Sequence, residues 1–136
     1  MRILIADDDL TLTRLLEDRL RERGHEVFVA QDAVEAWQTT QRVLPDIVLL
    51  DIKMPGGSGL NVLRRWKQNH KSRDIPIVVI TAAEEPGSLQ QALALQPDGL
   101  LRKPFQVAEL ELEITRLMAA RTLAQAAATP PGKTGR

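Results

Sequence analysis

Short apolar runs alternate with amphipathic stretches along most of the chain. Five such runs predict strands, over residues 3–6, 27–29, 47–50, 75–80 and 99–101. These runs are apolar throughout rather than alternating with polar residues, which is typical of a parallel sheet covered on both faces. Between and after the runs, apolar residues recur at helical spacing and predict five helices, marked by Leu12, Leu15, Leu16 and Leu20, by Val34, Trp37 and Val43, by Leu60, Leu63 and Trp66, by Leu89, Ala92 and Leu93, and by Val107, Leu110, Ile114 and Leu117.

Glycine and proline mark the breaks between these elements. Gly24 is a natural stop for the first helix, and Pro45 follows the second. Residues 55–59 (PGGSG) predict a turn into the third helix. The last helix continues through alanines to about Ala128, and residues 129–136 have the composition of a disordered linker.

The composition is that of one globular α/β domain and excludes several kinds of site. Of the 136 residues, 43% are apolar, enough to form a core without disulfides. Eighteen basic residues balance eighteen acidic ones, which argues against direct nucleic-acid binding and against an anionic membrane surface. The absence of cysteine excludes thiolate zinc sites and cysteine nucleophiles. With no signal peptide and no apolar run as long as a membrane span, the expected location is the cytoplasm.

Chemically active side chains follow the ends of the predicted strands. Asp7, Asp8 and Asp9 follow the first strand, and single residues follow the third, fourth and fifth: Asp51, Thr81 and Lys103. In an open parallel sheet, ligands bind at the carboxyl ends of the strands, near the point where the strand order reverses. Carboxylates gathered there without histidine or cysteine predict a magnesium site. An aspartate at a strand end is also a common helix cap, and Asp9 fits that alternative.

Four stretches in register resemble the receiver domain of two-component response regulators, of the CheY-like kind. They are residues 3–9 (ILIADDD), 45–55 (PDIVLLDIKMP) with Gly59, 78–82 (VVITA) and 101–105 (LRKPF). The resemblance covers residues 1–121, which we take as the receiver domain, with residues 122–136 as a helix extension and linker. It implies a flavodoxin-like fold, a doubly wound five-stranded parallel sheet of order 2-1-3-4-5 with five helices.

The resemblance also implies a role for each site residue. Asp51 would be the phosphoacceptor, and Asp8, Asp51 and the backbone carbonyl of Lys53 would ligate Mg²⁺ directly, with Asp7 acting mainly through water. Thr81 and Lys103 would contact the phosphoryl oxygens, the lysine as a point charge. The bond between Lys103 and Pro104 is typically cis in this family. Each residue has a plainer alternative, such as a β-branched strand residue for Thr81 or a surface lysine for Lys103.

Three positions depart from the common receiver pattern. Leu100 stands where many receivers carry tyrosine or phenylalanine, so a switch based on a tyrosine rotamer is excluded. Lys53 and Ala83 flank the site at positions that commonly tune the access of hydrolytic water, and Glu84 could pair with Lys53. Residues 96–99 (QPDG) stand where many receivers carry a glycine-alanine sequence and a pair of acidic residues. This difference weakens the inference that the chain makes the charged dimer contacts of some DNA-binding regulators.

The leading hypothesis is a phosphorylation-dependent switch that catalyses only its own phosphorylation and dephosphorylation. Its partners would be a sensor histidine kinase or phosphotransfer protein and an output domain or downstream protein, and a homodimer is left open. One alternative is a protein-interaction module with an unused pocket. Another is a magnesium-dependent phosphohydrolase, which is disfavoured because the residue two positions after Asp51 is Lys53 and not a second acid.

Overall fold

The five apolar runs form a single parallel sheet with strand order β2-β1-β3-β4-β5 in the computed structural model of the chain. The structure describes residues 1–54, 59–82 and 86–128. This order is the predicted flavodoxin-like one, so the predicted fold class is confirmed. The strands are β1 (Arg2–Ala6), β2 (Glu26–Ala30), β3 (Ile47–Asp51), β4 (Ile77–Thr81) and β5 (Gly99–Arg102).

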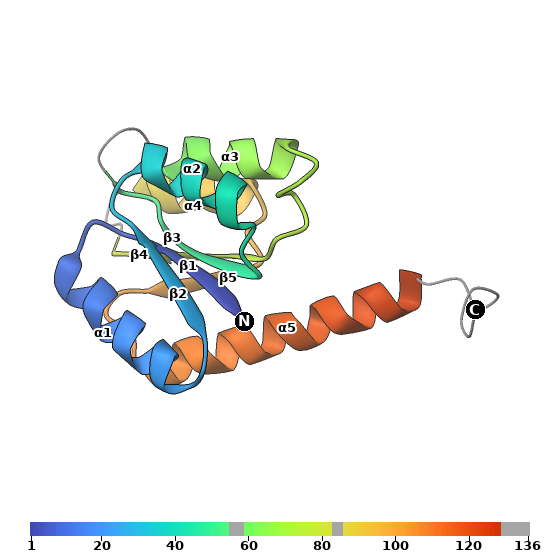
Figure 1. Cartoon of the computed structure of the whole chain (residues 1–136). Helices are drawn as coiled ribbons and strands as arrows, with labels where there is room; N and C mark the ends of the chain where they lie inside the picture. The colour runs from blue at the N-terminus through green and yellow to red at the C-terminus, as the bar shows by residue number, and fades with distance from the viewer. Residues whose placement is uncertain (55–58, 83–85, 129–136) are drawn as a thin grey trace.

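Five helices cover the two faces of the sheet (Figure 1). Helices α1 and α5 pack on one face, and α2, α3 and α4 pack on the other. The alternation of side chains along each strand divides the core between the faces. In β1, Ile3 and Ile5 belong to the α1/α5 layer, whereas Leu4 belongs to the opposite layer. The helices are α1 (Leu10–Glu22), α2 (Ala33–Val43), α3 (Gly59–Gln68), α4 (Pro86–Ala94) and α5 (Val107–Ala128).

The strand predicted over residues 75–80 begins later than the apolar run does. Ile75 is buried, yet its backbone N–H donates to the Ser72 carbonyl, so it belongs to the preceding turn. Pro76 has no N–H to give to a ladder, although its carbonyl accepts from Val48. The ladder therefore starts at Ile77 and runs one residue further than predicted, to Thr81.

Two helix boundaries follow the local chemistry that the sequence indicates. The Asp9 carboxylate accepts a hydrogen bond from Leu12 N at 3.1 Å, which confirms Asp9 as the cap of α1. Helix α1 ends just before Gly24, whose φ of +87° is a conformation that residues with a Cβ rarely adopt.

Among the described helices, none combines the length and apolar character that a membrane crossing requires. The predicted turn before Gly59, the linker at 129–136 and the interpretations of Ala83 and Glu84 lie outside the described residues.

Candidate functional site

The ends of β1, β3, β4 and β5 bring together the residues that the sequence singled out. Asp7 follows β1 directly, Asp51 and Thr81 are the last residues of β3 and β4, and Lys103 follows β5. Because β1 and β3 are neighbours while β2 lies on the other side of β1, the chain reverses its winding between these two strands. The site therefore lies at the topological switch point, where doubly wound folds bind ligands.

The Asp51 carboxylate is buried and each of its oxygens has a different donor. Oδ1 accepts the backbone N–H of Lys53 at 2.9 Å. Oδ2 accepts the ammonium of Lys103 at 2.9 Å, across 52 residues of sequence. One donor thus belongs to the segment that follows β3, and the other to the segment that follows β5. The two together fix the orientation of the carboxylate at the edge of the sheet.

Asp7 is the most deeply buried acid of the site. Its Oδ1 accepts the backbone N–H of Asp9 at 2.9 Å, and its Oδ2 lies 2.7 Å from Lys103 Nζ as an ion pair. Oδ2 has no aligned hydrogen bond within the described part of the chain, so the contact with the ammonium is electrostatic. Burial raises the pKa of Asp7 above its ordinary value, and the nearby charge of Asp51 adds to this, whereas Lys103 opposes it.

Lys103 bridges the two buried carboxylates. Burial alone would lower the pKa of its ammonium, but its close contacts with the Asp7 and Asp51 carboxylates and the attraction of their negative charges outweigh that cost and raise the pKa. Lys103 therefore forms ion pairs with both Asp7 and Asp51. The bond between Lys103 and Pro104 is cis, as the family resemblance predicts.

Asp8 completes a group of carboxylates suited to a hard cation. Unlike Asp7 and Asp51, Asp8 is exposed, and one ligand oxygen from each of the three lies within 4.8 Å of the others. The donors are all oxygen, and Asp7 Oδ2 is a buried carboxylate oxygen without an aligned hydrogen bond. Within the described residues, the Lys103 ammonium pairs with two of these three carboxylates, those of Asp7 and Asp51. These residues fit Mg²⁺.

Thr81 and Lys53 also lie at this edge of the sheet. Thr81 is buried at the last position of β4, and its carbonyl accepts the Lys103 backbone N–H at 2.9 Å. This backbone bond places Thr81 and Lys103 side by side at the same edge. Lys53 is exposed, and its backbone lies against the Asp51 carboxylate through the N–H described above.

Two of the departures from the receiver pattern occupy defined positions. Leu100 pairs in register with Val79 of β4 and packs, half-buried, against the apolar layer beneath α2, α3 and α4. Asp98 is engaged within its own chain, because its carboxylate accepts the Ile77 N–H at 2.8 Å and lies 3.4 Å from Lys67 Nζ. Both contacts lie at the amino end of the sheet, away from Asp51.

Gly59 packs closely against the backbone that follows Asp51, a contact that the sequence analysis did not predict. Its N–H donates to the Ile52 carbonyl at 3.1 Å, so the start of α3 lies directly on the residue after Asp51. A Cβ at Gly59 would come within 2.5 Å of Ile52 Cα and 2.6 Å of the Asp51 carbonyl oxygen. Both neighbours are backbone atoms, so no side-chain rearrangement could make room. A glycine shortly after a strand-end acid is the signal that could have indicated this contact.

Comparison with known sequences identifies the same pattern. The chain matches the response regulator receiver domain family over residues 3–115. The virulence transcriptional regulatory protein PhoP of Shigella flexneri is 35% identical over 118 residues, which cover 87% of this chain and 52% of that protein. The chain therefore spans about half the length of the curated relatives that it matches.

Solved structures agree with the fold. The chemotaxis response regulator CheY4 of Vibrio cholerae superposes with a TM-score of 0.77 at 26% identity, covering 85% of this chain and 96% of that one. A CheY-like receiver domain protein from Methanospirillum hungatei JF-1 gives a TM-score of 0.84 at 23% identity, over 90% of this chain and 97% of that one. At that identity the second likeness supports the fold alone.

Proposed function

Because the chain belongs to the response regulator receiver domain family, we propose that Asp51 is the phosphoacceptor of a two-component or phosphorelay switch. The observation that supports this assignment is that both oxygens of the Asp51 carboxylate accept hydrogen bonds, which fix its orientation. Lys53 N–H contacts one oxygen and Lys103 Nζ the other, each at 2.9 Å, at the switch point of the sheet. A carboxylate oriented in this way is prepared to attack phosphorus in line with a leaving group.

The proposed transfer forms one bond and breaks one. An Asp51 carboxylate oxygen bonds to the phosphorus of a phosphohistidine, and the phosphorus–nitrogen bond breaks with its electron pair going to the imidazole. Lys103, already 2.9 Å from Asp51 Oδ2, neutralises charge on the phosphoryl oxygens. The Thr81 hydroxyl donates a hydrogen bond to another phosphoryl oxygen. Water later hydrolyses the acyl phosphate, which restores the Asp51 carboxylate and releases inorganic phosphate.

We assign Mg²⁺ as the cofactor of this chemistry. Asp8, Asp51 and the Lys53 carbonyl would ligate it directly, and Asp7 would act mainly through water. When bound, Mg²⁺ offsets the repulsion between the carboxylates and the incoming phosphoryl oxygens. The protein residues supply orientation, and Lys103 supplies a fixed positive charge.

The proposed partners follow from this role. A sensor histidine kinase or phosphotransfer protein would donate the phosphoryl group, and an output domain or downstream protein would read the altered state. We place residues 1–121 in the receiver domain and residues 122–136 in the extension and linker, and we place the reaction in the cytoplasm, where ATP sustains histidine kinases. In this proposal the chain catalyses only its own phosphorylation and dephosphorylation.

Phosphorylation with acetyl phosphate and Mg²⁺ tests the assignment, followed by intact-mass and peptide mass spectrometry. The wild-type chain should gain one hydroxylamine-labile phosphoryl group on Asp51, and Asp51→Asn should gain none. Asp74→Asn is the matched control, because Asp74 is an exposed carboxylate outside the site and its variant should be labelled like wild type. Labelling of Asp51→Asn at the wild-type level would refute Asp51 as the acceptor.

A further inference from the structure

The second half of α3 and the segment that leads from it to β4 carry a local surplus of positive charge. The sequence between Asp51 and Asp74 contains no acidic residue. Four exposed basic side chains lie there on α3 or just after it, and we call them the α3 basic surface: Arg64, Arg65, Lys71 and Arg73. Because the chain as a whole is neutral, this charge is unevenly placed and not a property of the composition.

The cations of the α3 basic surface are not neutralised by neighbouring acids. Among the described residues, no carboxylate forms an ion pair with any of the four. Lys67, by contrast, lies 3.4 Å from an Asp98 carboxylate oxygen. Basic side chains in the last turn of a helix interact favourably with its dipole, which accounts for Arg65. Lys71 and Arg73 lie beyond the end of α3 at Gln68, so the dipole does not account for them.

Arg65 stands at a notch between α2 and α3. Its guanidinium carbon lies over the Trp37 ring, 4.5 Å from the ring centre. The notch has a volume of about 270 Å³ and is lined by Trp37, Arg65, Gln68 and Asn69. The Lys71 N–H donates to Asn69 Oδ1 at 2.9 Å, so the backbone of Lys71 lies beside the notch. A guanidinium stacked on a ring presents a planar set of N–H donors, which matches the two oxygens of a carboxylate.

Apolar surface adjoins the same notch on α2. Val34 is 55% exposed and lies three residues before Trp37, so the two side chains are neighbours on one face of α2. A nucleic-acid backbone would pair with the cations through its phosphates and would leave the valine uncovered. A protein segment that carries both acidic and apolar side chains would cover the cations and the valine together. The mixture of charge and apolar surface therefore favours an acidic segment of a protein.

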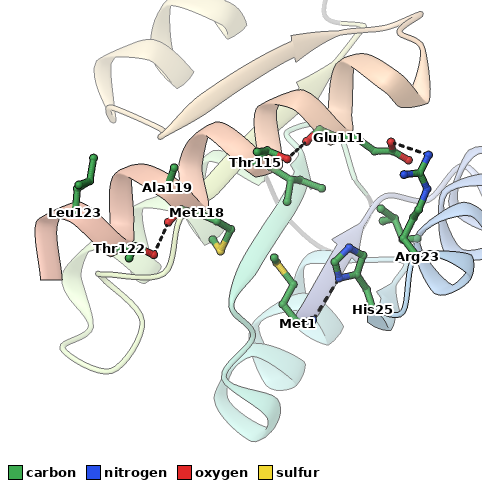
Figure 2. Close-up of a pocket in the computed structure, with 11 residues that line it drawn as sticks. Met1, Arg23, His25, Glu111, Thr115, Met118, Ala119, Thr122 and Leu123 are labelled. Atoms are coloured by element: carbon green, nitrogen blue, oxygen red, sulfur yellow. Dashed lines mark hydrogen bonds and ion pairs between the residues drawn. The ribbon is translucent and has the colours of Figure 1, made fainter. Parts of the chain in front are cut away.

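A larger groove, of about 850 Å³, lies between α5 and the segment that contains Arg23 and His25 (Figure 2). Its charged groups already have partners, because Arg23 pairs with Glu111 and the Met1 amino group lies 3.3 Å from His25 Nδ1. The charges of this groove therefore indicate no complementary partner, and the α3 basic surface differs from it in that respect.

We propose that the notch between α2 and α3, with Arg64, Arg65 and Lys71 around it, binds an acidic segment of a partner protein. Carboxylates of that segment pair with the cations, and one of its apolar side chains covers Val34. Helix α3 begins beside Asp51 and ends at Gln68, from which the chain leads to the start of β4 at the amino edge of the sheet. The bound segment leaves the Asp51 edge open, so this binding requires no phosphoryl group.

Fluorescence anisotropy on the whole unphosphorylated chain tests the chemistry of the surface. The probe is a labelled, glutamate-rich peptide interspersed with leucine, and the comparison peptide has glutamine in place of every glutamate. The wild-type chain should bind the acidic probe about tenfold more tightly than the glutamine peptide. Arg65→Gln and Lys71→Gln should each weaken binding of the acidic probe about fivefold. Lys71 is outside the contact with Trp37, so its variant tests the charge without disturbing that stack.

Arg19→Gln is the matched control, because Arg19 is an exposed arginine of α1, on the other face of the sheet, and its variant should bind like wild type. Equal binding of the two peptides, or an equal loss in Arg19→Gln and in both surface variants, overturns the proposal. Tighter binding of a single-stranded oligonucleotide of the same charge, weakened by Lys71→Gln, would make this a nucleic-acid site and also overturns it. The Trp37 indole N–H resonance should shift when the acidic probe binds, and shifts confined to residues of the groove beside α5 would contradict the location. Circular dichroism checks that the variants stay folded.

Discussion

At the scale of single residues, the orientation of Asp51 depends on two unrelated parts of the chain. The Lys53 N–H comes from the turn two residues later, and the Lys103 ammonium comes from the far side of β4. Only the second donor is a charged group, since the first is a backbone N–H. A substitution that displaces the turn should therefore disturb the carboxylate while every charged group remains in place.

Gly59→Ala is such a substitution. Its new methyl group would overlap Ile52 Cα and the Asp51 carbonyl, both backbone atoms, so β3 or α3 must move. We expect the free energy of unfolding to fall by about 1–3 kcal/mol, and the Lys53 amide resonance to shift as its contact with Asp51 changes. Chemical denaturation and amide NMR measure the two effects.

Gly87 of α4 offers the matched control, because among the described residues no atom outside its chain neighbours and its own helical turn lies within 4 Å of the position that its Cβ would occupy. Gly87→Ala should stay within about 0.5 kcal/mol of wild type. Equal stabilities for the two variants would show that the close approach at Gly59 carries no energetic weight.

His25 gives the stability of the chain a dependence on pH. Burial lowers the pKa of its imidazole below the ordinary value, the positive charge of the Met1 amino group lowers it further, and Glu111 opposes both. The folded state therefore favours neutral His25. Its contribution to stability is complete above the ordinary pKa of about 6.5 and is lost as the pH falls through the lowered folded-state pKa.

His25→Gln should remove that part of the pH dependence. Denaturant titrations between about pH 7 and pH 5 should show a smaller loss of stability in the variant than in wild type. His70→Gln is the control, because His70 is the other histidine of the chain and is exposed. A wild-type pH profile in His25→Gln would contradict the interpretation.

At the scale of elements, α1 begins at a residue that adjoins the acidic cluster without belonging to it. Asp9 caps α1 through Leu12 N, whereas the group that could hold a metal consists of Asp7, Asp8 and Asp51. Both Asp9→Ser and Asp9→Ala remove the charge, and only serine keeps a capping oxygen. We therefore expect Asp9→Ala to be less stable than Asp9→Ser by about 1 kcal/mol in urea unfolding, with Mg²⁺ binding retained in both. Loss of Mg²⁺ binding in both would instead make Asp9 part of the metal site.

The elements themselves were largely predictable, because four of the five apolar runs are followed directly by a polar residue. The run at 47–50 ends at Asp51, and the structure extends β3 only to include that residue. The prediction was wrong at Ile75, where burial alone resembles a strand, but the hydrogen bond of its N–H belongs to a turn. The pattern of apolar residues indicates which residues are buried, but it does not indicate the acceptor to which a backbone N–H donates.

The candidate site was predictable for a related reason. Parallel strands deliver their carboxyl ends to one edge, so residues that follow strands meet there whatever their distance in sequence. The bridge from Lys103 to both Asp7 and Asp51 depends on side-chain distances that no spacing encodes. The groove beside α5 was missed for the same reason, since it lies between a helix and a segment about ninety residues earlier in the chain.

At the scale of the whole molecule, a net charge of zero conceals a local excess of negative charge. Three carboxylates gather at the carboxyl edge of the sheet, where the Lys103 ammonium pairs with two of them, and burial raises the pKa of Asp7. The folded state therefore contains repulsion that the unfolded chain can relax by separating these groups. A cation that binds only the folded edge should stabilise the protein by mass action.

Mg²⁺ should accordingly raise the melting temperature in a saturable way at constant ionic strength. Above the dissociation constant, each tenfold increase in free Mg²⁺ should add about 1.4 kcal/mol to the free energy of unfolding. Asp8→Asn should reduce this gain strongly, because it removes the exposed carboxylate of the cluster, which we propose as a ligand, without opening the core. Asp74→Asn, which removes an equal charge outside the site, should keep the gain, and differential scanning calorimetry measures all three proteins. An equal gain in wild type and Asp8→Asn would mean that Mg²⁺ acts through general screening, since only a bound ion depends on one carboxylate and not on another of the same charge.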